Sequence, residues 1–251
     1  MSNGHTTPPA TVPEAFAAAV ADPARPLVTW YDDATGSRVE LSGATLGNWL
    51  AKTANLLTEG CGLGRGDTAL VDAPPHWQTG AVLLGCWAAG LRVHVGAAPA
   101  AGPSPAVVFA AAGRVGRYAG GPSEVYGLAL DPLGGPMPDP PPGVWDYVTE
   151  VRGYGDRYDP VATVLPDDPA THLTHAQLCR SAADRAAANG VTPGARVLID
   201  VDACPDPLDW LLAPLVVGAH AVLCTRLDAA ALPARLAAER VDVTVGVAAR
   251  P

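Results

Sequence analysis

The alternation of apolar and polar residues predicts a chain in which helices and strands follow one another in turn. From Ser42 to Leu57 the apolar positions recur every three or four residues, which is the period of an amphipathic helix. An unbroken apolar run over 68–72 predicts a buried strand, and a second helix is expected over 76–89, closed by Gly90. Because this order recurs, the pattern predicts an α/β fold with mainly parallel sheets flanked by helices.

The same signals of period, capping residue and chain breaker predict the other elements. Asp and Gly residues over 32–36 predict a hairpin between the first two strands. The proline-rich stretch 131–143 predicts an irregular loop, which we favour over a PxxP-type peptide ligand because proline removes N–H donors and restricts its neighbours. Further helices are expected over 14–21, 144–152, 174–189, 208–217 and 227–239, and further strands over 27–31, 38–41, 91–95, 106–109, 125–130, 196–201, 219–224 and 241–245.

The two halves of the chain resemble each other at a constant offset. Gly66 and Gly194 differ by 128 positions, as do Gly90 and Gly218. At the same offset five residues between these glycines match in type: Leu70, Val71, Asp72, Leu83 and Leu84 correspond to Leu198, Ile199, Asp200, Leu211 and Leu212. A unit of helix, glycine turn, strand, helix, glycine turn and strand that occurs twice predicts two related subdomains. The expected repeats are 42–95 and 174–224, and the expected units are a flexible tail over 1–12, a first α/β subdomain with the hairpin over 13–160, and a second, truncated α/β subdomain over 161–251.

Composition and charge narrow the function classes. The 251 residues are 49% hydrophobic and 16% charged, which predicts a packed globular core. A net charge of −9 without a basic run argues against nucleic acid and anionic membranes as partners. The longest uncharged apolar stretches, 79–91 and 210–219, are shorter than the roughly 18–20 residues of a membrane span. Residues 1–9 do not have the pattern of a signal peptide, so a cytoplasmic protein is expected.

Cysteine and lysine usage add two constraints. The only lysine of the chain is Lys52, so any chemistry that requires a lysine of this chain depends on that residue. The cysteines are odd in number and show no C-x-x-C spacing, which predicts buried reduced thiols and not a disulfide framework. They are Cys61, Cys86, Cys179, Cys204 and Cys224.

Three segments carry a family resemblance. Residues 40–95 contain the runs ELSGATLGNWLAKTANLL and GLGRGDTALVDAPPHWQTGAVLLGCWAAGLRVHV, residues 172–224 begin with HLTHAQLC, and residues 232–250 read LPARLAAERVDVTVGVAAR. These runs resemble the N-terminal domain of the adenylate-forming enzymes, the AMP-dependent acyl-CoA synthetase/ligase superfamily, and most of all its short actinobacterial relatives. The residues that match the family's motif after its phosphate loop are Leu173, Thr174 and His175.

The chain departs from that family at the phosphate loop. The resemblance implies a Ser/Thr/Gly-rich loop ending in Pro-Lys-Gly just before Leu173, where backbone N–H groups and a lysine would hold polyphosphate. Residues 162–172 contain no Gly and no Lys, and two prolines and two carboxylates stand there instead. The degenerate phosphate-loop positions are Pro166, Asp167, Asp168, Pro169 and Thr171.

These departures predict a protein without adenylation activity. The family's Tyr-Gly-x-Thr-Glu motif, ribose-binding aspartate and lid lysine would fall after Pro251, and no catalytic residue is assigned here. We therefore expect a non-catalytic binding, scaffolding or regulatory protein without cofactor, with another protein chain as the expected kind of partner. The alternatives are half of a split acid–thiol ligase that needs a partner chain and uses ATP with Mg²⁺, or a module that keeps a nucleotide or acyl crevice.

Other constellations favour structural roles. His172, His175 and Cys179 have a spacing that could place them on one side of a helix start, but the family motif there has no metal, so no metal site is assigned. Asp72 and Asp200 end matching strands at the edge where open α/β sheets bind ligands. For these two carboxylates we favour capping of the following loops over paired acid–base chemistry.

Overall fold

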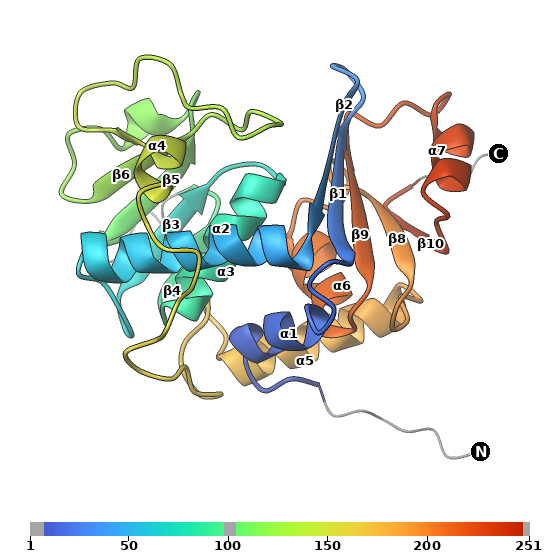
Figure 1. Ribbon diagram of the computed structural model, residues 1–251, viewed down its shortest axis with the longest axis horizontal. Helices are drawn as coiled ribbons and strands as arrows, with labels where there is room; N and C mark the ends of the chain where they lie inside the picture. Colours follow the sequence, from blue (N-terminus) through green and yellow to red (C-terminus); the bar gives the residue numbers. More distant parts are fainter. Residues whose placement is uncertain (1–7, 98–103, 248–251) are drawn as a thin grey trace.

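The computed structural model describes residues 8–97 and 104–247, which form two five-stranded sheets with helices between and around them (Figure 1). We call the sheet built from the earlier part of the chain sheet I and the other sheet II. Sheet I has the order β4 (Arg92–Val95), β3 (Thr68–Asp72), β5 (Val107–Ala111), β6 (Glu124–Leu128) and β7 (Trp145–Asp146). Sheet II has the order β10 (Val243–Val245), β8 (Arg196–Asp200), β9 (His220–Thr225), β1 (Pro26–Asp32) and β2 (Ser37–Ser42).

Every strand pair in the two sheets is parallel except the β1–β2 hairpin, which confirms the predicted α/β class. The helices are α1 (Val12–Ala19), α2 (Gly43–Asn55), α3 (Trp77–Ala88), α4 (Tyr147–Val151), α5 (His175–Ala188), α6 (Ala213–Val216) and α7 (Leu232–Ala238). Two π-helical turns, η1 (Leu56–Gly60) and η3 (Leu208–Leu212), and a 3₁₀ turn, η2 (Val115–Arg117), complete the structure of the described residues.

The predicted repeat is present in the strand register. Thr68 of β3 pairs with Arg92 of β4, and the residues 128 positions later, Arg196 of β8 and His220 of β9, also pair. Each of these strand pairs is parallel and is connected through helix, by α3 in the first case and by η3 and α6 in the second. The topological duplication expected for 42–95 and 174–224 is therefore confirmed.

The hairpin lies in a different place from the one predicted. Its first strand, β1, pairs in parallel with β9, with Val28 opposite Ala221, so the hairpin extends sheet II. The sequence assigns residues 13–160 to one subdomain, but strand pairing joins 26–42 to the sheet of the second half. The hairpin's own pattern fixes its two strands and their turn, whereas the neighbouring strand is chosen by burial of Leu27, Val28 and Trp30 in the common core.

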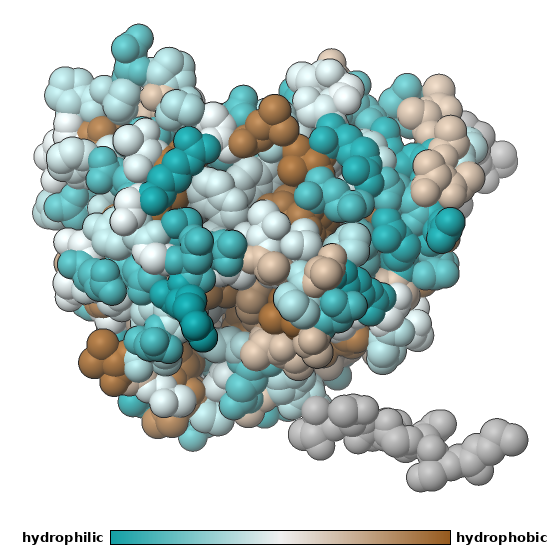
Figure 2. Space-filling model, in the orientation of Figure 1, coloured by the Kyte–Doolittle hydropathy of each residue, from teal (hydrophilic) through white to brown (hydrophobic). Residues whose placement is uncertain are grey.

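One large hydrophobic cluster holds both halves together. It includes residues of α1, α2, α3 and α5 and the inner faces of both sheets, and Figure 1 shows α2 and α3 lying between the sheets. Smaller clusters cover the outer faces, with Met137 over sheet I and α7 over sheet II. On the face shown in Figure 2 hydrophilic residues predominate, and hydrophobic residues form small separate patches.

Helix ends follow local chemistry, with some differences from the prediction. Ser42 and Thr174 accept backbone N–H bonds at the starts of α2 and α5, as their capping residue types predict. The helix expected over 208–217 is divided into η3 and α6, because Pro214 cannot donate a helical hydrogen bond. The helix expected over 227–239 is only Leu232–Ala238.

The loop over 131–143 is irregular as predicted. Its Asp139 has a φ of 47°, which interrupts the extended left-handed helix that a PxxP ligand adopts. Within the described residues no helix is both long and apolar enough to cross a bilayer. The five cysteines are free thiols, three of them buried and Cys61 and Cys204 half-buried.

Candidate functional site

The N-terminus of α5 is where the family resemblance would place a phosphate loop. The first N–H groups of a helix have no partner within the helix and form a ready-made anion site. Here the first three donate to oxygens of the preceding segment: the carbonyl of Asp168 at 3.0 Å, the carbonyl of Pro166 at 2.9 Å and the hydroxyl of Thr174 at 3.3 Å. The segment thus uses the donors that a phosphate group would need.

The carboxylate of Asp168 points inward. It accepts the Leu165 N–H at 2.8 Å and forms an ion pair with Arg65, and the residue is only 6% exposed. Burial raises the pKa of this carboxyl, but the Leu165 N–H and the Arg65 guanidinium outweigh burial and hold the pKa below its usual range. Asp168 is therefore a charged, paired group, and of the two predicted carboxylates only Asp167 is exposed.

The same segment is attached to sheet I. The carbonyl of Ala170 accepts two hydrogen bonds, from the N–H of Val93 in β4 at 2.8 Å and from the indole of Trp87 in α3 at 3.0 Å. Pro169 forms a bridge with Thr174, which closes a tight turn. Residues 166–170 therefore join α5 of the second half to α3 and β4 of the first half.

The remaining motif residues have separate positions. Thr171 accepts the Leu173 N–H at 3.1 Å, and both side chains are half-buried. His175 is buried, and its Nδ1 accepts the N–H of Val12 at 3.4 Å, which docks the start of α1 onto α5. Burial lowers the pKa of His175 to about 4, despite the opposing charge of Asp168, so the ring is neutral at pH 7.

The hypothetical metal trio does not assemble on one side. His172 is exposed, whereas His175 and Cys179 are buried. Among the described residues no group of three or more His, Cys, Asp or Glu side chains is placed to hold a metal ion.

A cleft of about 670 Å³ opens beside this segment, between the two halves. Clefts of this size between domains are the usual places for small-molecule binding. The floor is apolar, and a few polar side chains stand among the lining residues. The apolar lining includes Trp87, Val93, Val95, Leu173, Leu178, Leu208 and Leu212, and the polar lining includes His94, Thr171, His172, Ser181 and Asp206.

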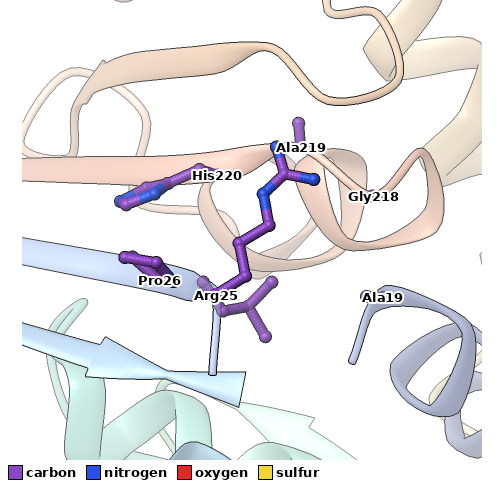
Figure 3. Close-up of a pocket in the computed structure, with 7 residues that line it drawn as sticks. Ala19, Arg25, Pro26, Gly218, Ala219 and His220 are labelled. Carbon is purple, nitrogen blue, oxygen red and sulfur yellow. The ribbon is translucent and has the colours of Figure 1, made fainter. Parts of the chain in front are cut away.

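Two other hollows differ from this cleft. A groove of about 710 Å³ lies between α1 and α2 under residues 156–160. Figure 3 shows a small recess where Arg25 reaches toward Gly218 and Ala219 and the ring of His220 lies near Pro26. The volume of that recess is about 10 Å³, the space of a single water, so it is not a ligand site.

Lys52 has a structural position. Its ammonium group donates to the carbonyl of Tyr154 at 2.6 Å and lies 2.7 Å from the carboxylate of Asp156. The side-chain amide of Asn55, also in α2, donates to the carbonyls of Gly155 and Arg157. Both side chains of α2 therefore bind the segment 154–157, which follows α4. The only lysine of the chain thus binds residues 154–156 to α2.

The two strand-end carboxylates also differ. Asp200 accepts the N–H of Asp202 at 3.1 Å, so it caps its loop as predicted. Asp72 is buried and is bound by Arg114 and Tyr118, at 2.6 and 2.7 Å, which the sequence prediction missed. The available signal is the spacing of Arg114 and Arg117, which follow the next strand and lie on one turn. Arg65 gives no such signal, since 103 positions separate it from Asp168.

Comparison with solved structures shows the fold. An acyl-CoA synthetase from Brucella canis matches with a TM-score of 0.70 and 16% identity over 93% of this chain and 46% of that one. A fatty acid AMP ligase from Legionella pneumophila matches with a TM-score of 0.66 and 13% identity, over 94% and 44%. The N-terminal domain of FACL13 from Mycobacterium tuberculosis matches with a TM-score of 0.64 and 16% identity, over 93% and 62%. The chain therefore has the N-terminal-domain fold of adenylate-forming ligases and spans about half the length of these structures.

A closer relative is found by sequence. No family model matches the chain. A protein of Mycobacterium tuberculosis (strain ATCC 25618 / H37Rv) described as a TIGR03089 family protein is 42% identical over 224 residues, which cover 88% of this chain and 91% of that protein. Identity at this level over nearly the full length of both chains shows common family membership, and the chain belongs to the TIGR03089 family.

Proposed function

We propose that this protein is a non-catalytic relative of the adenylate-forming ligases that acts as a binding or scaffolding protein. The observation that carries the proposal is the closed N-terminus of α5, whose first three N–H groups donate to Asp168, Pro166 and Thr174. Adenylation needs preorganised donors and a cation around the phosphates as pyrophosphate leaves. Residues 162–172 supply neither a lysine nor a glycine for that role.

The energetic argument favours exclusion of triphosphate. A phosphate group at this place would displace three internal hydrogen bonds and lie near the paired carboxylate of Asp168. The contacts that a phosphate-loop lysine and free N–H groups would make with ATP are charge-assisted and worth about 1.5–3 kcal/mol each, and without them we expect an ATP affinity in the millimolar range or weaker. Under this proposal the chain needs no ATP, Mg²⁺ or other cofactor.

The cleft between the two halves is the proposed binding place. Its apolar floor and sparse polar groups suit a small molecule or a peptide side chain without a polyphosphate group. Val95 offers a way to test this, because it lines the cleft and is 43% exposed, so a larger side chain can enter the cleft without repacking the core.

The decisive experiment is ATP–pyrophosphate exchange with a panel of carboxylic acids, together with calorimetric titration of ATP and Mg²⁺. We expect no exchange above a heat-inactivated control and no binding at micromolar ATP. Acid-dependent exchange by the chain alone would overturn the proposal. Exchange that appears only when a second polypeptide is added would instead establish the split-ligase alternative.

A second measurement tests the cleft. Small molecules extracted from the purified protein are compared by mass spectrometry with those from Val95→Trp and from an exposed control, Val161→Trp, since Val161 is 96% exposed. A compound that is retained by the native chain and by Val161→Trp and lost in Val95→Trp supports binding in the cleft. Equal retention by all three proteins assigns any bound compound to another place.

A further inference from the structure

A charged cluster lies at the carboxyl edge of sheet I, away from α5. Asp72, the last residue of β3, is buried, and Arg114 donates to its Oδ1 at 2.6 Å. Tyr118 donates to its Oδ2 at 2.7 Å, and Arg117 approaches the same oxygen at 3.4 Å. All three donors belong to the turn around η2, which follows β5. One buried carboxylate thus anchors two guanidinium groups at this edge.

The position of the cluster in the topology is informative. In sheet I the chain leaves β3 through α3 to β4 on one side, and it leaves β5 through η2 to β6 on the other. β3 and β5 are neighbours, with Asp72 opposite Ala110. The connections therefore diverge between these two strands, and in open α/β sheets the crevice outside the carboxyl ends at such a switch point is where ligands bind.

The charges of the cluster do not cancel. Two guanidinium groups face one carboxylate, which leaves one positive charge in a protein whose net charge is −9. The side chain of Arg117 is 63% exposed and that of Arg114 is 41% exposed. A guanidinium carries five N–H donors, and the 3.4 Å contact of Arg117 engages its Nη1 only weakly, so donors of both arginines face solvent.

We propose that Arg114 and Arg117 form a binding site for a small dianion, a phosphate group in the first instance, at the switch point of sheet I. Planar guanidinium groups bind phosphate oxygens in a bidentate manner, and two on one turn can hold the same group. Asp72 acts as a positioning residue, because it orients Arg114 and the turn from beneath. The site is independent of the α5 segment, so its test and the test for ATP adenylation can fail separately.

The test is a titration of the full-length protein with inorganic phosphate, followed by ¹H–¹⁵N NMR at constant ionic strength, with chloride as the reference anion. We expect saturable shifts of amides at the carboxyl ends of β3 and β5. Arg117→Gln should raise the phosphate concentration at half-saturation at least tenfold, because it removes a charge-assisted contact. A parallel titration with glycerol 3-phosphate distinguishes a phosphate monoester from free phosphate by which of the two saturates at lower concentration.

The matched control is Arg92→Gln, which removes the same charge from an exposed arginine at the amino end of β4. Arg92→Gln should leave the half-saturation unchanged. Arg117→Lys keeps the charge but not the planar fork, and should give an intermediate value. An equal effect of Arg92→Gln and Arg117→Gln, or the absence of saturation in the native protein, would overturn the proposal.

Discussion

The two halves of the molecule use the same backbone unit with the same hydrogen bonds. Gly66 donates to the carbonyl of Gly90 at 3.4 Å, and Gly194, 128 positions later, donates to the carbonyl of Gly218 at 3.2 Å. The bond from Leu91 to Cys86, at 2.9 Å, likewise has its counterpart between residues 219 and 214, also at 2.9 Å. The positive φ values of these glycines allow the chain to turn from helix to strand in both halves.

The halves differ at the switch point of each sheet. In sheet II the chain leaves β8 toward β9, and β10 lies on the other side of β8. Gly246 follows β10 with a φ of 75°, and a Cβ there would lie 2.8 Å from Cys204 Sγ and 3.1 Å from the carbonyl of Asp200. The described backbone therefore fills the switch point of sheet II. At the switch point of sheet I, Arg114 and Arg117 instead form ion pairs with the buried carboxylate of Asp72. A duplicated framework thus conserves its turns and varies the chemistry at the strand ends.

The two halves should differ most in the stability cost of adding a methyl group where α3 crosses α2. A Cβ at Gly85 would lie 2.5 Å from Thr53 Cβ, and Thr53 is held in place by its hydrogen bond to Tyr147. In the second half the position at the same 128-residue offset is Ala213, which carries a Cβ, so the close approach that requires glycine belongs to the first half. We expect Gly85→Ala to lower the free energy of unfolding by about 3 kcal/mol in urea denaturation.

The control for this crossing is Gly80→Ala in the same helix. A Cβ at Gly80 would have its nearest neighbours at 3.5 Å, an ordinary contact, so the helical preference for alanine should give a gain of up to about 1 kcal/mol. A similar loss in both variants would show that the cost comes from α3 as a helix and not from its contact with Thr53.

The equivalent glycines Gly90 and Gly218 offer a direct test of the repeat. Both have positive φ, at 80° and 68°, so alanine should cost about 1 kcal/mol at each from backbone strain. A Cβ at Gly90 would also lie 3.2 Å from Arg65 Cα, whereas nothing lies within 4 Å at Gly218. We expect Gly90→Ala to cost about 2 kcal/mol in thermal and urea unfolding, twice the cost of Gly218→Ala. Equal costs would mean that the Arg65 turn moves aside freely.

Loss of charge at the equivalent carboxylates Asp72 and Asp200 should change the free energy of unfolding by smaller amounts. Burial raises the pKa of Asp72, but the bonds from Tyr118 and Arg114 outweigh it and hold the pKa below 3.8. The charged form therefore contributes stability that is present above about pH 4 and is lost as the pH falls through the folded-state value. Because both arginines are largely exposed, Asp72→Asn should cost only about 1–2 kcal/mol at pH 7, and Asp200→Asn less than about 0.5 kcal/mol.

The pH dependence of stability tests whether the loss in Asp72→Asn comes from the charge of this carboxylate. Urea unfolding of the native protein and of Asp72→Asn is compared at pH 7 and pH 3, and the difference between the two proteins should shrink at the lower pH. A constant difference would assign the loss to packing of the Asp72 side chain instead of to its ion pairs.

Sequence periodicity predicted most elements because their causes are local. Ser42, Thr174 and the glycine turns act within a few residues, and the order of strands and helices follows from apolar periods. The hairpin was assigned to the wrong subdomain because strand neighbours are chosen by long-range burial. The sequence did not predict the two π-helical turns. They lie where α2 ends at Leu56 and where α6 begins next to Pro214, and the apolar period does not distinguish a π-helical turn from an α-helical one.

At the candidate site, too, local features follow from the sequence and long-range contacts do not. The sequence predicts that residues 162–172 replace a phosphate loop, because Gly and Lys are missing there and two prolines are present, and this stays a prediction. The direction of the Asp168 carboxylate was beyond that analysis, because its partner, Arg65, is 103 positions away. The structure turns this carboxylate inward, and the carbonyls of Asp168 and Pro166 accept the first two N–H groups of α5.

By itself the sequence determined the α/β class, the 128-residue repeat and the absence of Gly and Lys from residues 162–172, because each depends on residue identity and short-range spacing. Only the tertiary structure decided which sheet takes the hairpin, which arginine meets Asp168, and which strand end carries an open pair of arginines. These outcomes depend on burial and charge pairing between segments far apart in the chain, and such contacts leave no periodic signal in the sequence.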